Sequence, residues 1–157
     1  MITIRTATVA DLDALVESQS KLFRDDAGVH DHHVDITWPA RLGHERYAPL
    51  IDDDEWLILV ATHDTADIVI GHLVGYWFEA GPTRHPGRFA VLQSIYVDPD
   101  ERDAGVGSLL TQRFLDWSRE HGCIEAGVSV YAENRSAQRF YTRHGFAPTS
   151  IEFVRPL

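Results

Sequence analysis

The feature that most constrains the fold of this chain is a segment past its middle, where a β-type run passes through a turn into a glycine-bearing helix. It reads Ile95-Tyr96-Val97-Asp98-Pro99-Asp100-Glu101-Arg102-Asp103-Ala104-Gly105-Val106-Gly107-Ser108-Leu109-Leu110. Glycines let a ligand approach the backbone, and free N–H groups in a first helical turn favour an anion such as a pyrophosphate. The dinucleotide fingerprint fails because its third glycine position is Leu110. The segment therefore predicts an anion-binding turn or, alternatively, tight helix–sheet packing.

Hydrophobic periodicity assigns the remaining elements. Strands are expected at 2–6, 56–62, 68–78, 89–97, 124–131 and 146–154, and helices at 8–23, 39–50, 106–121 and 134–144. The polar residues 25–37 predict a loop. Strands and helices mix without strict alternation, so residues 1–157 are expected to form a single α/β (α+β) domain around one mixed, mostly antiparallel central sheet.

Composition narrows the class of protein. The only cysteine, Cys123, excludes an internal disulfide and fits a reducing cytoplasm. No apolar run approaches the roughly 20 residues that span a membrane, and the N-terminus lacks the layout of a signal peptide. A cytoplasmic location is therefore expected.

The net charge of −10 is unevenly distributed. Residues 1–80 carry 15 acidic and 5 basic side chains, whereas residues 81–157 carry 9 of each, so the entire excess lies in the first half. An acidic chain disfavours nucleic acid and anionic membrane as partners and permits a cationic one. The alternative is a solvated acidic surface without a partner.

A second segment supplies the decisive pattern. It reads Asn134-Arg135-Ser136-Ala137-Gln138-Arg139-Phe140-Tyr141-Thr142-Arg143-His144-Gly145-Phe146, that is, N-x-x-A-x-x-F-Y-x-x-x-G-F. Together with R-x-x-G-x-G at Arg102–Gly107, it resembles the GNAT superfamily of acetyl-CoA-dependent N-acetyltransferases. The resemblance implies the GNAT fold, with six to seven strands, about four helices and a splay between the fourth and fifth strands. Residues 89–147 would form the acetyl-CoA-binding core and residues 1–80 the acceptor side.

The resemblance also implies a role for each matching residue. The glycine turn would wrap the pyrophosphate, the strand before it would bind the pantetheine arm, and Asn134, Ala137 and Phe140 would contact coenzyme A. The Val97 N–H would polarise the thioester carbonyl, and Tyr141 would protonate the leaving thiolate. The implied cofactor-binding residues are Ile95, Tyr96, Val97, Arg102, Asp103, Ala104, Gly105, Val106, Gly107, Ser108, Asn134, Ala137, Phe140 and Tyr141.

Two positions depart from the family pattern. Asp103 and Ala104 stand where many members have glycine and a basic or polar residue. Gln93 stands where many members have a glutamate that deprotonates the amine through water, and an amide accepts no proton at neutral pH. The base must then lie elsewhere or the amine must arrive neutral. Glu79 is the preferred candidate; the others are His72, His85 and Tyr76.

Other chemistry-bearing residues favour structural roles. His30, Asp31, His32 and His33 are adjacent in a polar segment, which rarely supplies a closed ligand set, so no metal is expected. The aromatic residues of the first half either line an acceptor pocket or fill the core; they are Trp38, Tyr47, Trp56 and Trp77.

The resemblance and the acidic first half together predict an N-acetyltransferase acting on a small cationic amine by direct attack in a ternary complex. Two alternatives remain open: acetylation of a protein N-terminus or lysine, and a catalytically silent acetyl-CoA-binding module, which Gln93 in place of glutamate would suit. A homodimer is also possible.

Overall fold

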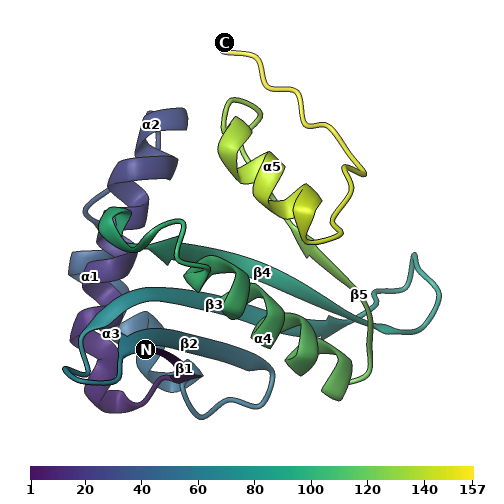
Figure 1. Cartoon of the computed structure of the whole chain (residues 1–157). Helices are drawn as coiled ribbons and strands as arrows, with labels where there is room; N and C mark the ends of the chain where they lie inside the picture. Colours follow the sequence, from purple (N-terminus) through teal and green to yellow (C-terminus); the bar gives the residue numbers. More distant parts are fainter.

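The computed structural model describes all residues, 1–157, and has one five-stranded sheet in the order of the sequence (Figure 1). Its strands are β1 (Ile2–Thr6), β2 (Trp56–His63), β3 (Val69–Glu79), β4 (Arg88–Val97) and β5 (Cys123–Val128). The first three neighbouring pairs are antiparallel, and β4 and β5 are parallel. The predicted mixed, mostly antiparallel α/β architecture is confirmed.

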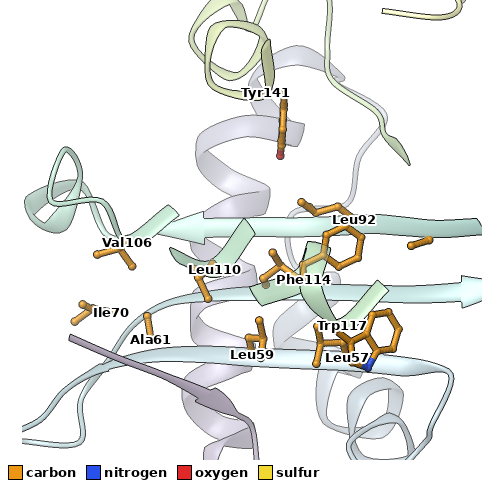
Figure 2. Close-up of a cluster of buried hydrophobic side chains, with 12 residues drawn as sticks. Leu57, Leu59, Ala61, Ile70, Leu92, Val106, Leu110, Phe114, Trp117 and Tyr141 are labelled. Atoms are coloured by element: carbon orange, nitrogen blue, oxygen red, sulfur yellow. The ribbon is translucent and has the colours of Figure 1, made fainter. Parts of the chain in front are cut away.

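Helices cover both faces of this sheet. Alternate residues of a strand face opposite sides, and β2 accordingly divides its side chains between two cores. Ile58 and Val60 pack with Leu15 and Tyr47, from α1 (Leu12–Leu22) and α3 (Trp38–Tyr47). Leu57, Leu59 and Ala61 join the core under α4 (Val106–Glu120), whose inward residues are seen in Figure 2. A further helix, α5 (Arg135–Arg143), follows β5. None of the helices combines the length and the apolar character that a membrane span requires.

The number of strands is a correction to the sequence analysis, which expected six to seven. The missing strand is the one expected at 146–154, where the chain is extended and exposed, with Ile151 and Phe153 81% and 89% accessible. The apolar alternation there is typical of a strand, but a strand also needs an edge to pair with. Within this chain the segment pairs with none.

The segment expected to be a loop at 25–37 is a second correction. Helix α1 continues through a π-helix, η2 (Phe23–Ala27), into the short α2 (Gly28–His30), and only residues 31–37 are irregular. Polar residues do not end a helix as long as its backbone hydrogen bonds can form. Gly28, the first glycine of the chain, lies at the start of α2 and does not end the helix either. A β-carbon on Gly28 would lie 2.6 Å from Ile36 Cγ2, so this glycine lets the chain fold back.

Candidate functional site

The central feature of the site is the separation of the two parallel strands. Pairing of β4 with β5 ends at Leu92 and Val128, so residues 93–97 of β4 have no neighbour on that side (Figure 1). Asp98 N–H donates to Ile70 O on β3 at 2.8 Å. Because successive backbone amides of a strand point in opposite directions, the N–H groups of Ile95 and Val97 point away from β3. They are unpaired donors on the open side of β4.

The turn before α4 presents further backbone donors. Asp103 and Gly105 both have left-handed backbone conformations, with φ of 66° and 82°, and Gly105 is the N-cap of α4. The amides of the first helical turn have no intrahelical partner. The side chains of residues 102–105 are exposed, and Arg102 Nε donates to Val97 O at 3.0 Å, which ties the turn to the strand. This arrangement suits an anion at the helix N-terminus.

The two sequence motifs meet at Gly107. A β-carbon there would lie 3.3 Å from Phe140 Cε2 and 3.9 Å from Val97 Cγ2. A glycine therefore allows the ring of Phe140 on α5 to pack against the first turn of α4. Beside this contact, the hydroxyl of Ser108 lies 3.0 Å from His144 Nε2. His144 is a neighbour of the turn that sequence reasoning did not single out.

Helix α5 is capped at its N-terminus by Asn134. Asn134 Oδ1 accepts from Ala137 N–H at 3.0 Å, and Asn134 Nδ2 donates to Asp26 Oδ1 at 2.9 Å. The side chain therefore links α5 to η2, on the opposite side of the open strand end. Ala137 and Phe140 lie against the α4 core.

Tyr141 is a buried phenol on α5. Its side chain points from α5 toward β4 and belongs to the core with Leu92 (Figure 2). The residue is 8% exposed, and its hydroxyl makes no hydrogen bond within the chain. Burial raises the pKa of Tyr141 to about 12, and the nearby carboxylate of Asp26 adds to the rise. The phenol therefore keeps its proton at neutral pH.

The structure does not bring Glu79 to this site. In the β3–β4 pairing, Gly71 lies opposite Val97 and Glu79 opposite Arg88. Eight residues of extended strand, about 25 Å, thus separate Glu79 from the Val97 end of the site. Glu79 is exposed and lies 3.6 Å from the guanidinium of Arg88. This separation argues against Glu79 as the general base.

The other base candidates are disfavoured by their surroundings. His72 is fully buried, and burial lowers its pKa to about 3, so the ring stays neutral and a poor proton acceptor at neutral pH. Tyr76 packs against Trp56, with the ring centroids 4.7 Å apart and the ring planes tilted by 32°. His85 is exposed in the β3–β4 loop.

His72 belongs to a buried polar network that reaches the strand beside Gln93. Its Nδ1 lies 2.5 Å from Ser18 Oγ and its Nε2 3.3 Å from Ser94 Oγ. Gln19 Nε2 donates to Ser94 Oγ at 2.9 Å, while Gln19 Oε1 is buried without a partner. The network joins α1 to β3 and β4 on the face opposite α4.

Two carboxylates that sequence reasoning missed face the open end of β4. Asp25 accepts from Tyr96 Oη at 2.8 Å, and Asp26 lies beside Asn134 and His30, with His30 Nε2 at 3.4 Å. Burial raises the pKa of Tyr96 to about 12. The signal was present as adjacent aspartates, but only the η2 helix shows where they point.

The remaining candidates have structural surroundings. No group of three or more His, Cys, Asp or Glu side chains is arranged to hold a metal ion. Cys123 is partly buried, which raises the pKa of its thiol. The four aromatic residues mostly contact other side chains; Trp38 meets Phe23 and Tyr47, and Trp77 meets Arg88.

A comparison of the sequence with protein families decides the assignment. Residues 13–146 match the acetyltransferase (GNAT) family. The chain belongs to the GNAT family. Its fold agrees: the aminoglycoside N-acetyltransferase AAC(6')-Iy in complex with CoA superimposes with a TM-score of 0.78 at 19% identity, over 99% of this chain and 95% of that one.

Two relatives of known sequence are both named as acetyltransferases. An aminoglycoside N(6')-acetyltransferase type 1 from Acinetobacter genomosp. 13 is 29% identical, over 64% of this chain and 68% of its own. A mycothiol acetyltransferase from Saccharopolyspora erythraea is 32% identical over 66% of this chain, which spans about a third (32%) of that protein. The family and these relatives indicate an acetyl-CoA-dependent N-acetyltransferase.

Proposed function

We propose that this GNAT-family chain transfers the acetyl group of acetyl-CoA to the primary amine of a small cationic molecule. One observation carries the proposal: the open side of β4 offers unpaired N–H groups at Ile95 and Val97, while Tyr141 approaches the same strand as a protonated phenol. Donors for a developing oxyanion and an acid for a leaving group are what acyl transfer from a thioester requires.

The chain's residues divide the binding of the co-substrate between two elements. The turn at Arg102–Ser108 and the first amides of α4 hold the pyrophosphate, and the free edge of β4 holds the pantetheine arm. Gly107 keeps the α4–α5 junction closed, because Phe140 fills the space that a side chain would occupy. Bound acetyl-CoA supplies the thioester that is cleaved.

The chemical step then needs few protein groups. Val97 N–H donates to the thioester carbonyl oxygen as negative charge develops there, and the amine nitrogen forms a bond to the carbonyl carbon. The carbon–sulfur bond breaks as Tyr141 Oη passes its proton to the departing sulfur. The nitrogen of the new amide gives up its extra proton to water, and the Tyr141 phenolate regains a proton from water. Asp25 and Asp26 face this end of β4, but each already accepts a hydrogen bond, from Tyr96 and Asn134 respectively. We therefore assign neither as the base and attribute much of the rate to the positioning of a neutral amine.

Asp26 supports a cationic acceptor. It is a partly exposed carboxylate on η2 that faces Asn134, His30 and Tyr141. It lies in the half of the chain that carries the ten excess negative charges. An ammonium group elsewhere on the acceptor would be attracted to this side of the open strand.

The experiment that tests the proposal measures free thiol released from acetyl-CoA with a panel of polyamines, aminoglycosides, neutral amines and peptides. We expect turnover with cationic small amines, and calorimetry should show acetyl-CoA binding without an acceptor. Binding without turnover on any amine would contradict the proposed reaction, and turnover confined to peptides would contradict the small acceptor.

A further inference from the structure

The open end of β4 is linked to the helices on one face of the sheet. Alternate side chains of a strand face opposite sides, and the side chains of residues 94, 96 and 98 all reach α1 and η2. Each makes a polar contact there: Ser94 Oγ with Gln19 Nε2 at 2.9 Å, Tyr96 Oη with Asp25 Oδ2 at 2.8 Å, and Asp98 Oδ1 with Lys21 Nζ at 3.0 Å. The intervening residues, Ile95 and Val97, pack instead against the core under α4.

This segment needs such links because the sheet supports it less than the rest of β4. Residues 93–97 have no strand beside them on the β5 side. On the other side, the pairing with β3 shifts between Val74 and Gly75, so Gln93 is an extra residue, a β-bulge. A bulge leaves its extra residue unpaired and disrupts the local hydrogen bonds. The side chains that reach α1 and η2 therefore supply support that backbone pairing does not.

The contact between Tyr96 and Asp25 is the one best placed to orient the site. Tyr96 is 5% exposed and lies between Ile95 and Val97, whose N–H groups point into the open side of β4. Its hydroxyl donates to a carboxylate, and a hydrogen bond to an ionised group is roughly twice as strong as a neutral one. Asp25 belongs to η2, a π-helix, which is a rare structure that often occurs at functional sites. Fixing the Tyr96 side chain thus fixes the two flanking peptide groups.

Building on the proposed function, we propose that Tyr96 and Asp25 are positioning residues for acyl transfer, and that their hydrogen bond holds the Val97 N–H in line with the developing oxyanion. An oxyanion donor is effective only within about 2.7–3.1 Å of the position that the charged oxygen will occupy. A small displacement of the strand therefore slows the chemical step. Acetyl-CoA binding in the ground state is spread over the turn before α4, the strand and α5, so its affinity depends less on this one donor.

Substitutions that remove this hydrogen bond test its role in turnover. Tyr96→Phe and Asp25→Ala should each lower kcat about 10-fold, and the KM for acetyl-CoA should change less than about twofold. The double variant should be no slower than either single variant, because both substitutions remove the same interaction. Asp25→Asn keeps an oxygen that accepts from Tyr96 Oη, so its kcat should lie within about threefold of the wild-type value.

The control is Tyr76→Phe, which removes a hydroxyl from β3 opposite Val91, away from the open end, and should leave kcat unchanged. An unchanged kcat in Tyr96→Phe would overturn the proposal. So would a double variant about 100-fold slower than the wild type, because the two effects would then multiply as independent ones do. A change confined to KM would overturn it as well.

Hydrogen exchange measured by mass spectrometry needs no acceptor and therefore separates this proposal from the proposed function. In the protein without substrates, the backbone amides of residues 93–98 should exchange about tenfold faster in Tyr96→Phe than in the wild type or in Tyr76→Phe. Exchange unchanged by Tyr96→Phe would overturn the proposal. A wild-type protein that acetylates no amine, with faster exchange in Tyr96→Phe, would contradict the proposed function alone and confirm that the hydrogen bond holds β4.

Discussion

At the scale of the residue, the least expected environment is that of His72. The ring lies in the middle of a sheet, held by Ser18 and Ser94, and burial keeps it neutral with a pKa of about 3. The unfolded chain would bind this proton near pH 6.5. The contribution of His72 to stability is therefore fully present above pH 6.5. As the pH is lowered from 6.5 toward 3, the free energy of unfolding falls by up to about 1.4 kcal/mol per pH unit.

His72→Gln tests this dependence. The variant should lose stability at pH 7.5, because a buried network is disrupted, but its free energy of unfolding should fall less steeply than that of the wild type between pH 6.5 and 4.5. Urea denaturation at several pH values measures the slope. His85→Gln removes an exposed histidine and is the control; equal slopes for wild type and His72→Gln would show that His72 titrates normally.

Tyr141 gives the second prediction at this scale. Tyr141→Phe should lower turnover about 100-fold or more, since the proton donor is lost, while the affinity for acetyl-CoA changes less than about twofold. Stability should change little, because the hydroxyl makes no hydrogen bond within the chain. Tyr47→Phe is a matched control, as burial likewise raises the pKa of Tyr47 to about 12, but in the other core. Unchanged turnover in Tyr141→Phe would exclude it as the acid.

At the scale of the element, the turn that opens α4 combines a useful backbone with an unfavourable side chain. Asp103 adopts φ of 66°, which glycine adopts without strain, and its negative charge lies in a turn that we assign to a pyrophosphate. The backbone N–H groups of the turn attract a phosphate, whereas the negative charge of Asp103 repels it.

Two substitutions separate these effects. Asp103→Asn should tighten acetyl-CoA binding about two- to fivefold at low salt by removing repulsion. Asp103→Gly should do the same and also raise the free energy of unfolding by about 0.5–1 kcal/mol by relieving the left-handed backbone. Calorimetry and thermal denaturation are the measurements, with exposed Asp52→Asn as the control. Weaker binding in Asp103→Asn would instead mean that the carboxylate contributes to the site.

At the scale of the whole molecule, the charge is divided between the two halves of the chain. The ten excess negative charges lie in residues 1–80, which include α1, η2 and α3, and residues 81–157 are neutral overall with nine basic side chains. This division suits an anionic co-substrate on one side and a cationic acceptor on the other, and salt screens such attraction over roughly 10 Å at 0.1 M.

Ionic strength therefore gives a prediction for the whole molecule. Raising salt from 20 to 300 mM should increase KM for a dicationic amine several-fold, in initial-rate measurements at saturating acetyl-CoA. The KM for an amine with no second charged group should change much less. Asp26→Asn should raise KM for the dication at low salt and reduce its salt dependence. Equal salt dependence of KM for both amines would contradict the attraction of a cationic acceptor to the acidic half of the chain.

Sequence alone determined the features whose causes are local. The turn into α4, the cap of α5 at Asn134 and the buried apolar run of β2 each depend on residues within a few positions of one another, and all appear in the structure. The two motifs also identified the family correctly. Such patterns survive because neighbours in sequence are always neighbours in space.

Only the tertiary structure decided which distant groups meet. Glu79 was a reasonable base until the β3–β4 register placed it far from Val97. Asp26 became a candidate site residue only when η2 turned it toward Asn134. The segment at 146–154 has the apolar pattern of a strand but no partner in its own chain. Pairing across a sheet joins residues that are remote in sequence, and periodicity within a segment carries no information about which edge it will meet.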